Sequence, residues 1–320
     1  MNKIIPNLSL KKVSIIGIGL IGSSIALASK SKIKNIFVSL FDIDPIIRNQ
    51  ARDLNLGDEV TEEIGECVKG TDLVILAIPV GSMKNAIKTL IPHLNKDVII
   101  TDTGSTKVSV TKDLSNLLPK NCYYIGGHPL AGTEFSGPKS GFPSLFEDRY
   151  WLIIPDINPE NKIKTLEKFC QCLGSMTERV NVSYHDRIVA LTSHLPHLIA
   201  FTIVKTVSNL DDDIKKDVIK FSASGFRDFT RIASSDPVMW RDIFLNNQDS
   251  ILEILDRFNQ NLDIFKTCIK LKKGEELLEI FNKTREVRKL IVEARQDIPE
   301  DNKAKIYFKY SRNNSFPEGQ

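Results

Sequence analysis

Three glycines near the N-terminus have the spacing of a phosphate-binding turn. Gly17, Gly19 and Gly22 form the pattern G-x-G-x-x-G between an apolar run at 13–16 and a segment of small residues at 21–29. In a strand–turn–helix, the first glycine permits the turn, the second admits a pyrophosphate and the third lets the helix pack closely on the strand. The start of the helix adds backbone N–H donors for phosphates. The pattern favours a dinucleotide site over the alternative, a turn with three unremarkable glycines.

Asp42 narrows the identity of the dinucleotide. It ends the second apolar run, twenty positions after Gly22, where a carboxylate accepts both ribose hydroxyls and repels a 2′-phosphate. The alternative is a capping role before Asp44 and Pro45. Together with the glycines, Asp42 predicts NAD as the cofactor. The other expected cofactor contacts lie in the glycine turn and after a later strand: Leu20, Ile21, Ala77 and Pro79.

A single histidine lies in the segment 126–134, GGHPLAGTE, directly after another apolar run. Ligands of doubly wound sheets bind at the carboxyl ends of the strands, so we expect His128 in a loop near the nicotinamide. Its pKa range suits accepting a proton from a hydroxyl while a hydride leaves. A histidine that only hydrogen-bonds the turn fits these residues equally well. Ser105, in the segment 101–107 (TDTGSTK), precedes a predicted helix and by itself favours an N-cap.

Two pairs of polar residues fall in the C-terminal part of the chain. His194 and His197 lie three positions apart on a predicted helix; satisfied core histidines are the commonest interpretation, and a polar substrate pocket is the second. No third ligand accompanies them, so no metal site is expected. Arg227 and Arg231 lie four positions apart. Either one solvated helix face or a guanidinium fork for an anionic substrate explains that pair.

The elements that position these residues change character near residue 181. Before it, strands alternate with helices, which is typical of a doubly wound parallel sheet. The predicted strands are 13–16, 35–41, 73–78, 97–101, 123–125, 150–154 and 176–180, the last two completing the same sheet. After residue 181 only helical patterns follow, beginning with a long helix at 182–210 that is expected to be buried and to kink at Pro196.

These patterns predict an α/β fold with two domains. An N-terminal Rossmann-type, doubly wound sheet is expected at 1–180, an all-helical substrate and dimerisation domain at 181–300, and a polar tail at 301–320. Apolar residues at a 4-3 spacing between Ile251 and Ile269 predict a helix-packing seam, followed by a second amphipathic helix at 275–294. Such a seam lies either between two subunits, which favours a homodimer, or inside one chain.

Composition limits the other functions. The net charge of +3, with no basic run, gives no reason to expect a nucleic-acid partner. Five scattered cysteines without a C-x-x-C pair indicate free thiols in a reducing compartment. No signal peptide and no apolar run long enough to span a membrane are expected. The sequence thus predicts a soluble, cytoplasmic protein with a small-molecule substrate.

Six segments together resemble the prephenate/arogenate (cyclohexadienyl) dehydrogenase family of tyrosine biosynthesis. They are GIGLIG, Asp42, TDTGSTK, GGHPLAGTE, SHLPH at 193–197 and GFRDFTRIASSDPVMW at 225–240. The resemblance runs from about Val13 to Asp297, and the histidine and arginine segments are its most specific parts. It implies a Rossmann domain followed by a helical dimerisation domain. The chain is similar to the monofunctional members, without a chorismate mutase segment or an appended regulatory domain.

The resemblance also implies roles for individual residues. His128 matches the histidine that accepts the proton of the substrate's ring hydroxyl, Ser105 the serine that orients it, and Arg231 the arginine that binds the substrate carboxylate. Further matches line the substrate pocket: Thr133, Glu134, His197, Asp228 and Trp240, the last in its own or the partner's site. The implied reaction is the NAD-dependent oxidative decarboxylation of prephenate to 4-hydroxyphenylpyruvate, of arogenate to tyrosine, or of both. A β-hydroxyacid-dehydrogenase-like oxidoreductase and a non-catalytic NAD sensor are the alternatives.

Overall fold

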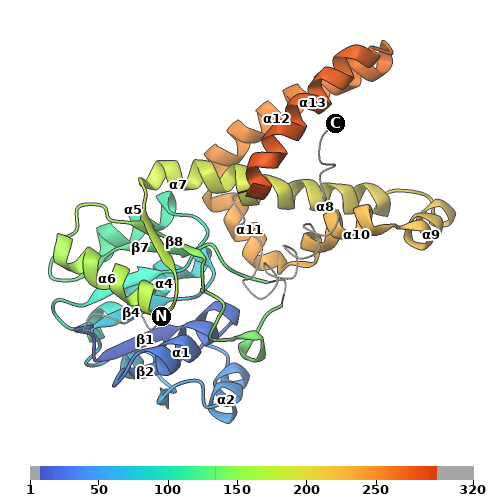
Figure 1. The fold of residues 1–320 in the computed structure, drawn as a ribbon. Coiled ribbons are helices and arrows are strands. Elements are labelled where there is room, and N and C mark those ends of the chain that lie inside the picture. Colours follow the sequence, from blue (N-terminus) through green and yellow to red (C-terminus); the bar gives the residue numbers. More distant parts are fainter. Residues whose placement is uncertain (1–7, 134, 294–320) are drawn as a thin grey trace, which may run out of the picture. The chain divides into compact units, whose positions relative to one another are not determined.

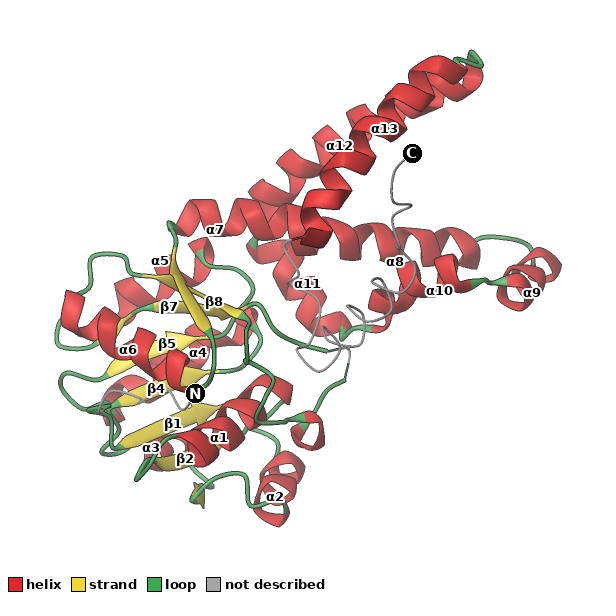
Figure 2. Cartoon of the chain, in the orientation of Figure 1, coloured by secondary structure: helices red, strands yellow, loops and turns green. Residues whose placement is uncertain are grey.

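A parallel six-stranded sheet forms the N-terminal part of the molecule (Figures 1 and 2). The computed structural model describes residues 8–133 and 135–293. The strand order is β3-β2-β1-β4-β5-β6, and every neighbouring pair is parallel. The strands are β1 (Lys12–Ile16), β2 (Phe37–Phe41), β3 (Glu59–Val60), β4 (Leu73–Leu76), β5 (Ile99–Asp102) and β6 (Tyr123–Tyr124). The chain runs outward from β1 in both directions, which confirms the predicted Rossmann-type doubly wound sheet.

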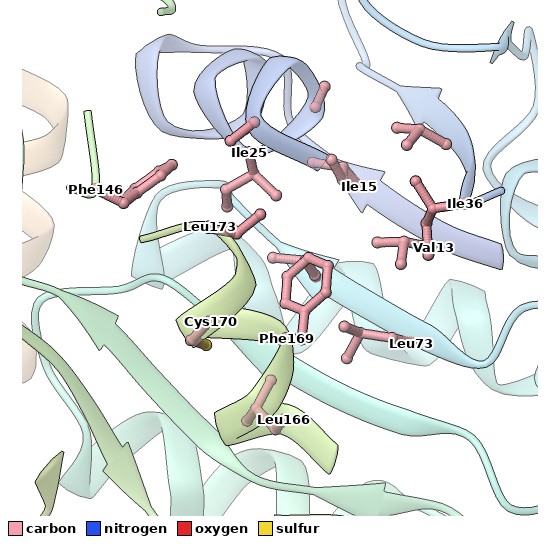
Figure 3. Packing of buried hydrophobic residues seen from close by; sticks show 14 of the residues in the cluster. Val13, Ile15, Ile25, Ile36, Leu73, Phe146, Leu166, Phe169, Cys170 and Leu173 are labelled. Atoms are coloured by element: carbon pink, nitrogen blue, oxygen red, sulfur yellow. The ribbon is translucent and has the colours of Figure 1, made fainter. Parts of the chain in front are cut away.

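Alternating residues of the central strands feed two separate cores, one on each face of the sheet. On one face, Ile15 and Leu73 pack with helices α1 (Leu20–Lys32) and α6 (Glu160–Cys172), as Figure 3 shows, and with α2 (Pro45–Asp53). On the other face, Ile16 and Val74 pack with α3 (Ile64–Val68), α4 (Val80–Leu90) and α5 (Val108–Leu117). Because both faces are covered, β1 and β4 are apolar apart from Lys12 and the buried Ser14, without a regular alternation of apolar and polar residues.

The last strands form a second sheet, which corrects the prediction of a single one. Strands β7 (Gly126–Pro129), β8 (Tyr150–Ile154) and β9 (Met176–Arg179) make a three-stranded sheet, with β7 antiparallel to β8. The backbone N–H of Ile125 still donates to Ile100 of β5, after which the chain changes partner to β8. A Cβ on Gly127 would lie 2.6 Å from the backbone oxygen of Asp102, so only glycine permits this close crossing over the end of β5.

From residue 182 to residue 293 the structure describes helices joined by short connections. They are α7 (Val182–Val189), a π-helical turn (Ala190–His194), α8 (Leu195–Ser208), α9 (Asp212–Phe221), α10 (Ser224–Thr230), a 3₁₀ turn (Arg231–Ser234), α11 (Pro237–Asn246), α12 (Gln248–Lys270) and α13 (Gly274–Glu293). The predicted interruption at Pro196 takes the form of the π-helical turn. Proline has no N–H and crowds the carbonyl of the preceding turn, and a wider turn accommodates it.

The long helix is not buried as predicted. Within α8 only Leu195 and Ala200 are buried, whereas Leu191 just before it and Val204 are exposed. Contrary to expectation, Val182–Ser208 is long and apolar enough to cross a membrane, although one such helix is weak evidence for a membrane span. The apolar residues around this helix predict that its surface is covered. They do not predict whether the same chain or another molecule covers it.

The chain divides into two compact units at Asp256 and Arg257, within α12. In the C-terminal unit, Phe265 of α12 stacks on Phe281 of α13 with ring centroids 6.0 Å apart. Phe265, a residue of the predicted seam, therefore packs against a helix of the same chain, whereas Leu262 and Ile269 of the seam are exposed. The predicted tail at 301–320 lies outside the described residues.

Candidate active site

The glycine turn between β1 and α1 has room for a ligand at one position and none at the other two. Gly17 has φ +99°, and a Cβ there would lie 2.4 Å from the backbone oxygen of Ala77. A Cβ on Gly22 would lie 1.9 Å from the oxygen of Gly17, whereas one on Gly19 would meet nothing within 4 Å. No side chain caps α1, and its first turn holds no acidic residue. The open side at Gly19 and the uncapped helix start together fit a phosphate group.

Asp42 joins the end of β2 to this turn. One carboxylate oxygen accepts the N–H of Ile18 at 2.8 Å, and the other accepts the N–H of Asp44 at 3.0 Å. Asp44 rather than Asp42 caps α2, through the N–H of Ile46 at 2.8 Å. Each oxygen of Asp42 keeps a second lone pair, so the half-buried carboxylate can still accept ribose hydroxyls.

The remaining expected cofactor residues border the same turn. Leu20 is buried and Ile21 half-buried at the start of α1. Ala77 follows β4, and its N–H donates to Ile16 of β1 at 2.7 Å. Pro79 precedes α4 and is exposed. An NAD molecule that follows the carboxyl ends of β1, β2 and β4 would meet these residues, so they fit the predicted cofactor.

His128 lies on strand β7, and not in a loop as predicted. Its backbone pairs with Leu152 of β8, and its side chain is buried. Nδ1 of His128 lies 2.8 Å from Nε2 of His185 on α7, and the two rings meet edge to face. The antiparallel pairing with β8 gives His128 a rigid backbone, which suits a residue that must hold a fixed orientation.

His185 is in turn hydrogen-bonded to its neighbour Asp186. Nδ1 of His185 lies 2.7 Å from Oδ1 of Asp186. The same carboxylate accepts the backbone N–H groups of Lys107, at 2.7 Å, and Val108, at 2.9 Å. These two donors stand at the start of α5, where the helix dipole favours a negative charge. A buried chain therefore runs from His128 through His185 to a carboxylate held at a helix N-terminus.

A buried ion pair lies next to the hydrogen-bonded residues His128, His185 and Asp186. The ammonium of Lys107 and the carboxylate of Asp102 are both fully buried and in contact. Asp102 also accepts the hydroxyl of Tyr124 at 2.6 Å and the N–H of Gly127, directly before His128, at 3.4 Å. The segment from Asp102 to Val108 thus holds both the strand that carries His128 and the carboxylate beside His185.

Burial keeps the histidines of this region neutral. It lowers the pKa of His128 well below the usual 6.5, and neighbouring His185 and the Lys107 ammonium act in the same direction. Burial likewise lowers the pKa of His185 to about 2, assisted by Lys107. Burial also raises the pKa of Asp186, against the effect of its two backbone donors. A neutral imidazole can accept a proton, so His128 is suited to act as a base near neutral pH.

A second polar group, from the π-helical turn, α8 and the end of α11, borders the first. Asn247 joins the two, since its amide nitrogen lies 2.9 Å from the backbone oxygen of Asp186 and 3.1 Å from Nδ1 of His194. Burial lowers the pKa of His194 to about 4, partly offset by Asp186 and by the backbone of Ser105. His197 stacks on Trp240 of the same chain with ring centroids 3.7 Å apart. Of the predicted pocket residues, His197 and Trp240 are therefore in direct contact.

The other predicted residues are less enclosed. Arg231 opens the 3₁₀ turn after α10, which packs against α8, and its charge adds to burial in lowering the pKa of His197. Asp228 and Thr133 are exposed, and Ser105 is half-buried. Within the described residues, no hydrogen bond joins Ser105 to His128. Glu134 lies outside the described residues.

Comparison with known proteins decides the family. Residues 25–182 match the model of the prephenate dehydrogenase nucleotide-binding domain, and residues 181–283 match the dimerisation domain. The chain is 42% identical over 279 residues to a cyclohexadienyl dehydrogenase of Zymomonas mobilis, covering 87% of this chain and 95% of the relative. The chain belongs to the prephenate dehydrogenase family.

Solved structures of related prephenate and arogenate dehydrogenases agree. The prephenate dehydrogenase of Aquifex aeolicus in complex with hydroxyphenyl propionate and NAD+ has a TM-score of 0.83 and 33% identity, covering 89% of this chain and 99% of that one. The Synechocystis arogenate dehydrogenase has a TM-score of 0.74 and 26% identity, covering 88% and 99%. This member of the prephenate dehydrogenase family is thus an NAD-dependent oxidoreductase, and the prediction of the cofactor is confirmed.

Two residues of the buried chain were missed in the sequence. His185 and Asp186 stand side by side in the first turns of α7, which Asn181 caps. The signal is weak, because a polar pair near the start of a helix is usually solvated. Asp102 and Lys107 belong to the segment TDTGSTK, in which only Ser105 is a predicted site residue.

Proposed function

We propose that this protein catalyses the NAD-dependent oxidative decarboxylation of prephenate, arogenate or both, as a step of tyrosine biosynthesis. Membership of the prephenate dehydrogenase family supports the reaction class. One observation carries the assignment of the base: His128 is buried, neutral and hydrogen-bonded through His185 to Asp186. A rigid neutral imidazole beside a nucleotide-binding sheet is what hydride removal from an alcohol carbon requires.

The substrate is a cyclohexadiene that carries a hydroxyl at ring carbon 4 and a carboxylate on the opposite, quaternary carbon. His128 accepts the hydroxyl proton while the hydrogen on the same carbon leaves as hydride. When bound, NAD supplies the hydride acceptor. The ring carboxylate then departs as carbon dioxide, and its bonding electrons complete the aromatic ring. Because aromaticity is gained, the overall reaction is effectively irreversible.

The anionic groups of the substrate need a cation, and we assign that role to Arg231. A guanidinium binds a carboxylate through two parallel N–H donors, which fixes orientation as well as charge. The packing of its 3₁₀ turn against α8, which carries His197, supports this role, as does its effect on the pKa of that histidine. Thr133, Glu134 and Asp228 are proposed to complete the pocket, and Ser105 to orient the substrate hydroxyl. For the cofactor we propose contacts from the glycine turn, Asp42, Ala77 and Pro79.

The decisive test is NADH formation with each substrate supplied separately. The purified protein is mixed with NAD and either prephenate or arogenate, and each reaction is repeated with NADP. Turnover of at least one substrate with NAD is expected, and the ratio of kcat/KM values assigns the preference. If the folded protein binds NAD but oxidises neither substrate, the cofactor assignment stands and the substrate assignment is wrong.

We further propose that the helical part forms a homodimer. The match to a dimerisation domain supports it, as do the apolar side chains that α8 exposes in a single chain. The family models meet at residues 181–182, which supports the division into an NAD-binding part at 1–180 and a substrate and dimerisation part at 181–300. Light scattering should give the mass of two chains; the mass of one would contradict the proposal. The five free cysteines support a cytoplasmic location, which cell fractionation can test.

A further inference from the structure

The hydrogen bonds around His128 restrict the position of its ring hydrogen. We infer that His185 and Asp186 hold His128 in the tautomer that carries hydrogen on Nδ1, leaving Nε2 free as the base. This inference rests on the proposed role of His128 and adds two positioning residues from a different element, α7. Neither residue needs to touch the substrate for this role.

Asp186 determines the first of these hydrogen positions. Its carboxylate receives the backbone N–H groups of Lys107 and Val108, which can only donate. The carboxylate is therefore an acceptor on this side, and the two donors at the helix N-terminus favour its anion against burial, which raises its pKa. Nδ1 of His185, 2.7 Å from Oδ1, must then carry a hydrogen. Since a neutral imidazole has one hydrogen, Nε2 of His185 is left with a lone pair.

The second hydrogen bond transmits this choice to His128. Nε2 of His185 lies 2.8 Å from Nδ1 of His128, and an acceptor there requires a donor on the other ring. His128 consequently carries its hydrogen on Nδ1, and its Nε2 is the basic nitrogen. A ring nitrogen that already held hydrogen could not accept the hydroxyl proton. The two bonds thus select the reactive form before substrate binds.

The surrounding charges oppose the inactive arrangement. If His185 were protonated, its Nε2–H would point at Nδ1 of His128 and move the hydrogen of that ring to Nε2. Burial of His185 and the ammonium of Lys107 disfavour this cation. Asp102 keeps that ammonium in place, because the two groups are paired and fully buried. After His128 accepts the proton, its Nδ1–H still donates to His185, and the chain stabilises the new positive charge.

The tautomer can be measured directly in the unmodified protein. Histidine side chains are labelled with ¹⁵N, and the shifts and couplings of Nδ1 and Nε2 distinguish the two tautomers. The resonances of His128 are identified by their loss in His128→Asn. We expect hydrogen on Nδ1 at neutral pH. Hydrogen on Nε2 would overturn the inference, and this outcome needs no variant of His185 that folds.

A matched pair of substitutions tests the consequence for catalysis. His185→Leu removes the acceptor, so we expect kcat to fall by about 10²-fold with little change in KM. His185→Gln keeps an acceptor at that end of the side chain and should recover most of the rate and the Nδ1–H tautomer. A wild-type kcat in His185→Leu would contradict the inference, as would equal losses in the two variants with the tautomer of His128 unchanged.

Failure of this inference is separable from failure of the proposed function. If the wild-type protein oxidises neither substrate, the proposed function is wrong, and the tautomer measurement still tests the inferred hydrogen position. If the wild-type protein is active, His128→Asn is inactive and His185→Leu is fully active, the function stands and the positioning role of His185 is rejected.

Discussion

Nδ1 of His128 and Nε2 of His185 lie 2.8 Å apart, although the two residues are 57 positions apart in the chain. One belongs to a strand of the small sheet and the other to the first helix of the helical part. The nucleotide-binding and helical parts therefore share a buried hydrogen bond at the proposed base, in addition to the bonds from Lys107 and Val108 to Asp186. Changes in either part can alter the chemistry at this bond.

Replacing His128 should separate chemistry from binding. For His128→Asn we expect kcat to fall by about 10²- to 10⁴-fold, the contribution of a positioned general base, while KM changes little. The measurement is initial NADH formation over a range of substrate concentrations. His93→Asn, an exposed histidine at the end of the 3₁₀ turn Ile91–His93, is the control and should keep its activity. Near-normal turnover in His128→Asn would exclude this residue as the base.

Arginine substitutions distinguish a substrate anchor from a solvated helix face. Arg231→Ala should raise KM for the substrate by about 10²-fold, in line with a charge-assisted pair that contributes about 3 kcal/mol. Arg231→Lys keeps the charge but not the fork, and should show an intermediate KM. Arg227→Ala, four positions away, is the comparison. A larger increase in KM for Arg227→Ala than for Arg231→Ala would reverse the assignment of the two arginines.

Two alanine substitutions in the glycine turn should act in different ways. The methyl of Gly22→Ala would overlap the backbone oxygen of Gly17, so we expect a lower free energy of unfolding as well as loss of NAD binding. The methyl of Gly19→Ala meets nothing within 4 Å in the protein alone, so the free energy of unfolding of this variant should be unchanged. It would enter the space of the pyrophosphate and raise Kd for NAD by about ten-fold or more. Calorimetry gives both Kd and stability; wild-type NAD affinity in Gly19→Ala would contradict the phosphate position.

The pH dependence of catalysis should reflect the buried environment of His128. The base must be neutral, and burial lowers its pKa well below 6.5. We therefore expect kcat/KM to stay constant as pH falls through 6.5 and to decrease only at more acidic values. The measurement is kcat/KM between about pH 5 and pH 8, with stability checked at each value. A decrease centred at the ordinary histidine pKa would show that His128 is solvated in the active protein.

The same burial makes folding sensitive to acid. His185 and His194 have folded pKa values of about 2 and about 4, below the unfolded value near 6.5. Between these values the unfolded chain binds more protons than the folded chain, so stability is full above about pH 6.5 and falls as pH decreases below it. Each such histidine contributes about 1.4 kcal/mol per pH unit in that window. Urea unfolding at pH 7.5 and at pH 5.5 should show a lower free energy of unfolding at the lower pH. In His194→Asn this decrease should be smaller. An equal decrease in the two proteins would contradict the buried neutral state of His194.

The sheet was predictable because its strands are short apolar runs that end at turn residues. Tyr150–Ile154 has the predicted bounds, and the alternation with helices predicts the parallel, doubly wound sheet, although β3 (Glu59–Val60) was not among the predicted strands. The second sheet was not predictable, because its cause is a close backbone crossing at Gly127 that no periodicity records. Exposure of α8 was also missed, since an apolar helix in a dimer and one in a core have the same composition.

In the candidate site, the residues of the sequence motifs were predictable, whereas the residues that hydrogen-bond to them or position them were not. His128 and Arg231 stand in segments of unusual composition, and the family resemblance points to them. His185 and Asp186 occupy an ordinary helix start, and their role depends on contacts with residues 57 and 78–79 positions away. Lysine side chains are almost never fully buried unless paired, so the sequence gives no sign that the ammonium of Lys107 is fully buried. Such partnerships arise only when the chain folds.

The carboxylate of Asp186 is held by the peptide backbone at the start of α5, and this has a consequence for how the protein can diverge. Every residue type except proline has a backbone N–H, so the hydrogen bond from position 108 to Asp186 does not depend on the side chain there. Val108 is itself exposed, and most substitutions there should leave the active site untouched. Related chains can therefore vary at this position while keeping the same charge beside the same histidine, and proline, which has no N–H to donate, is the one replacement expected to be selected against.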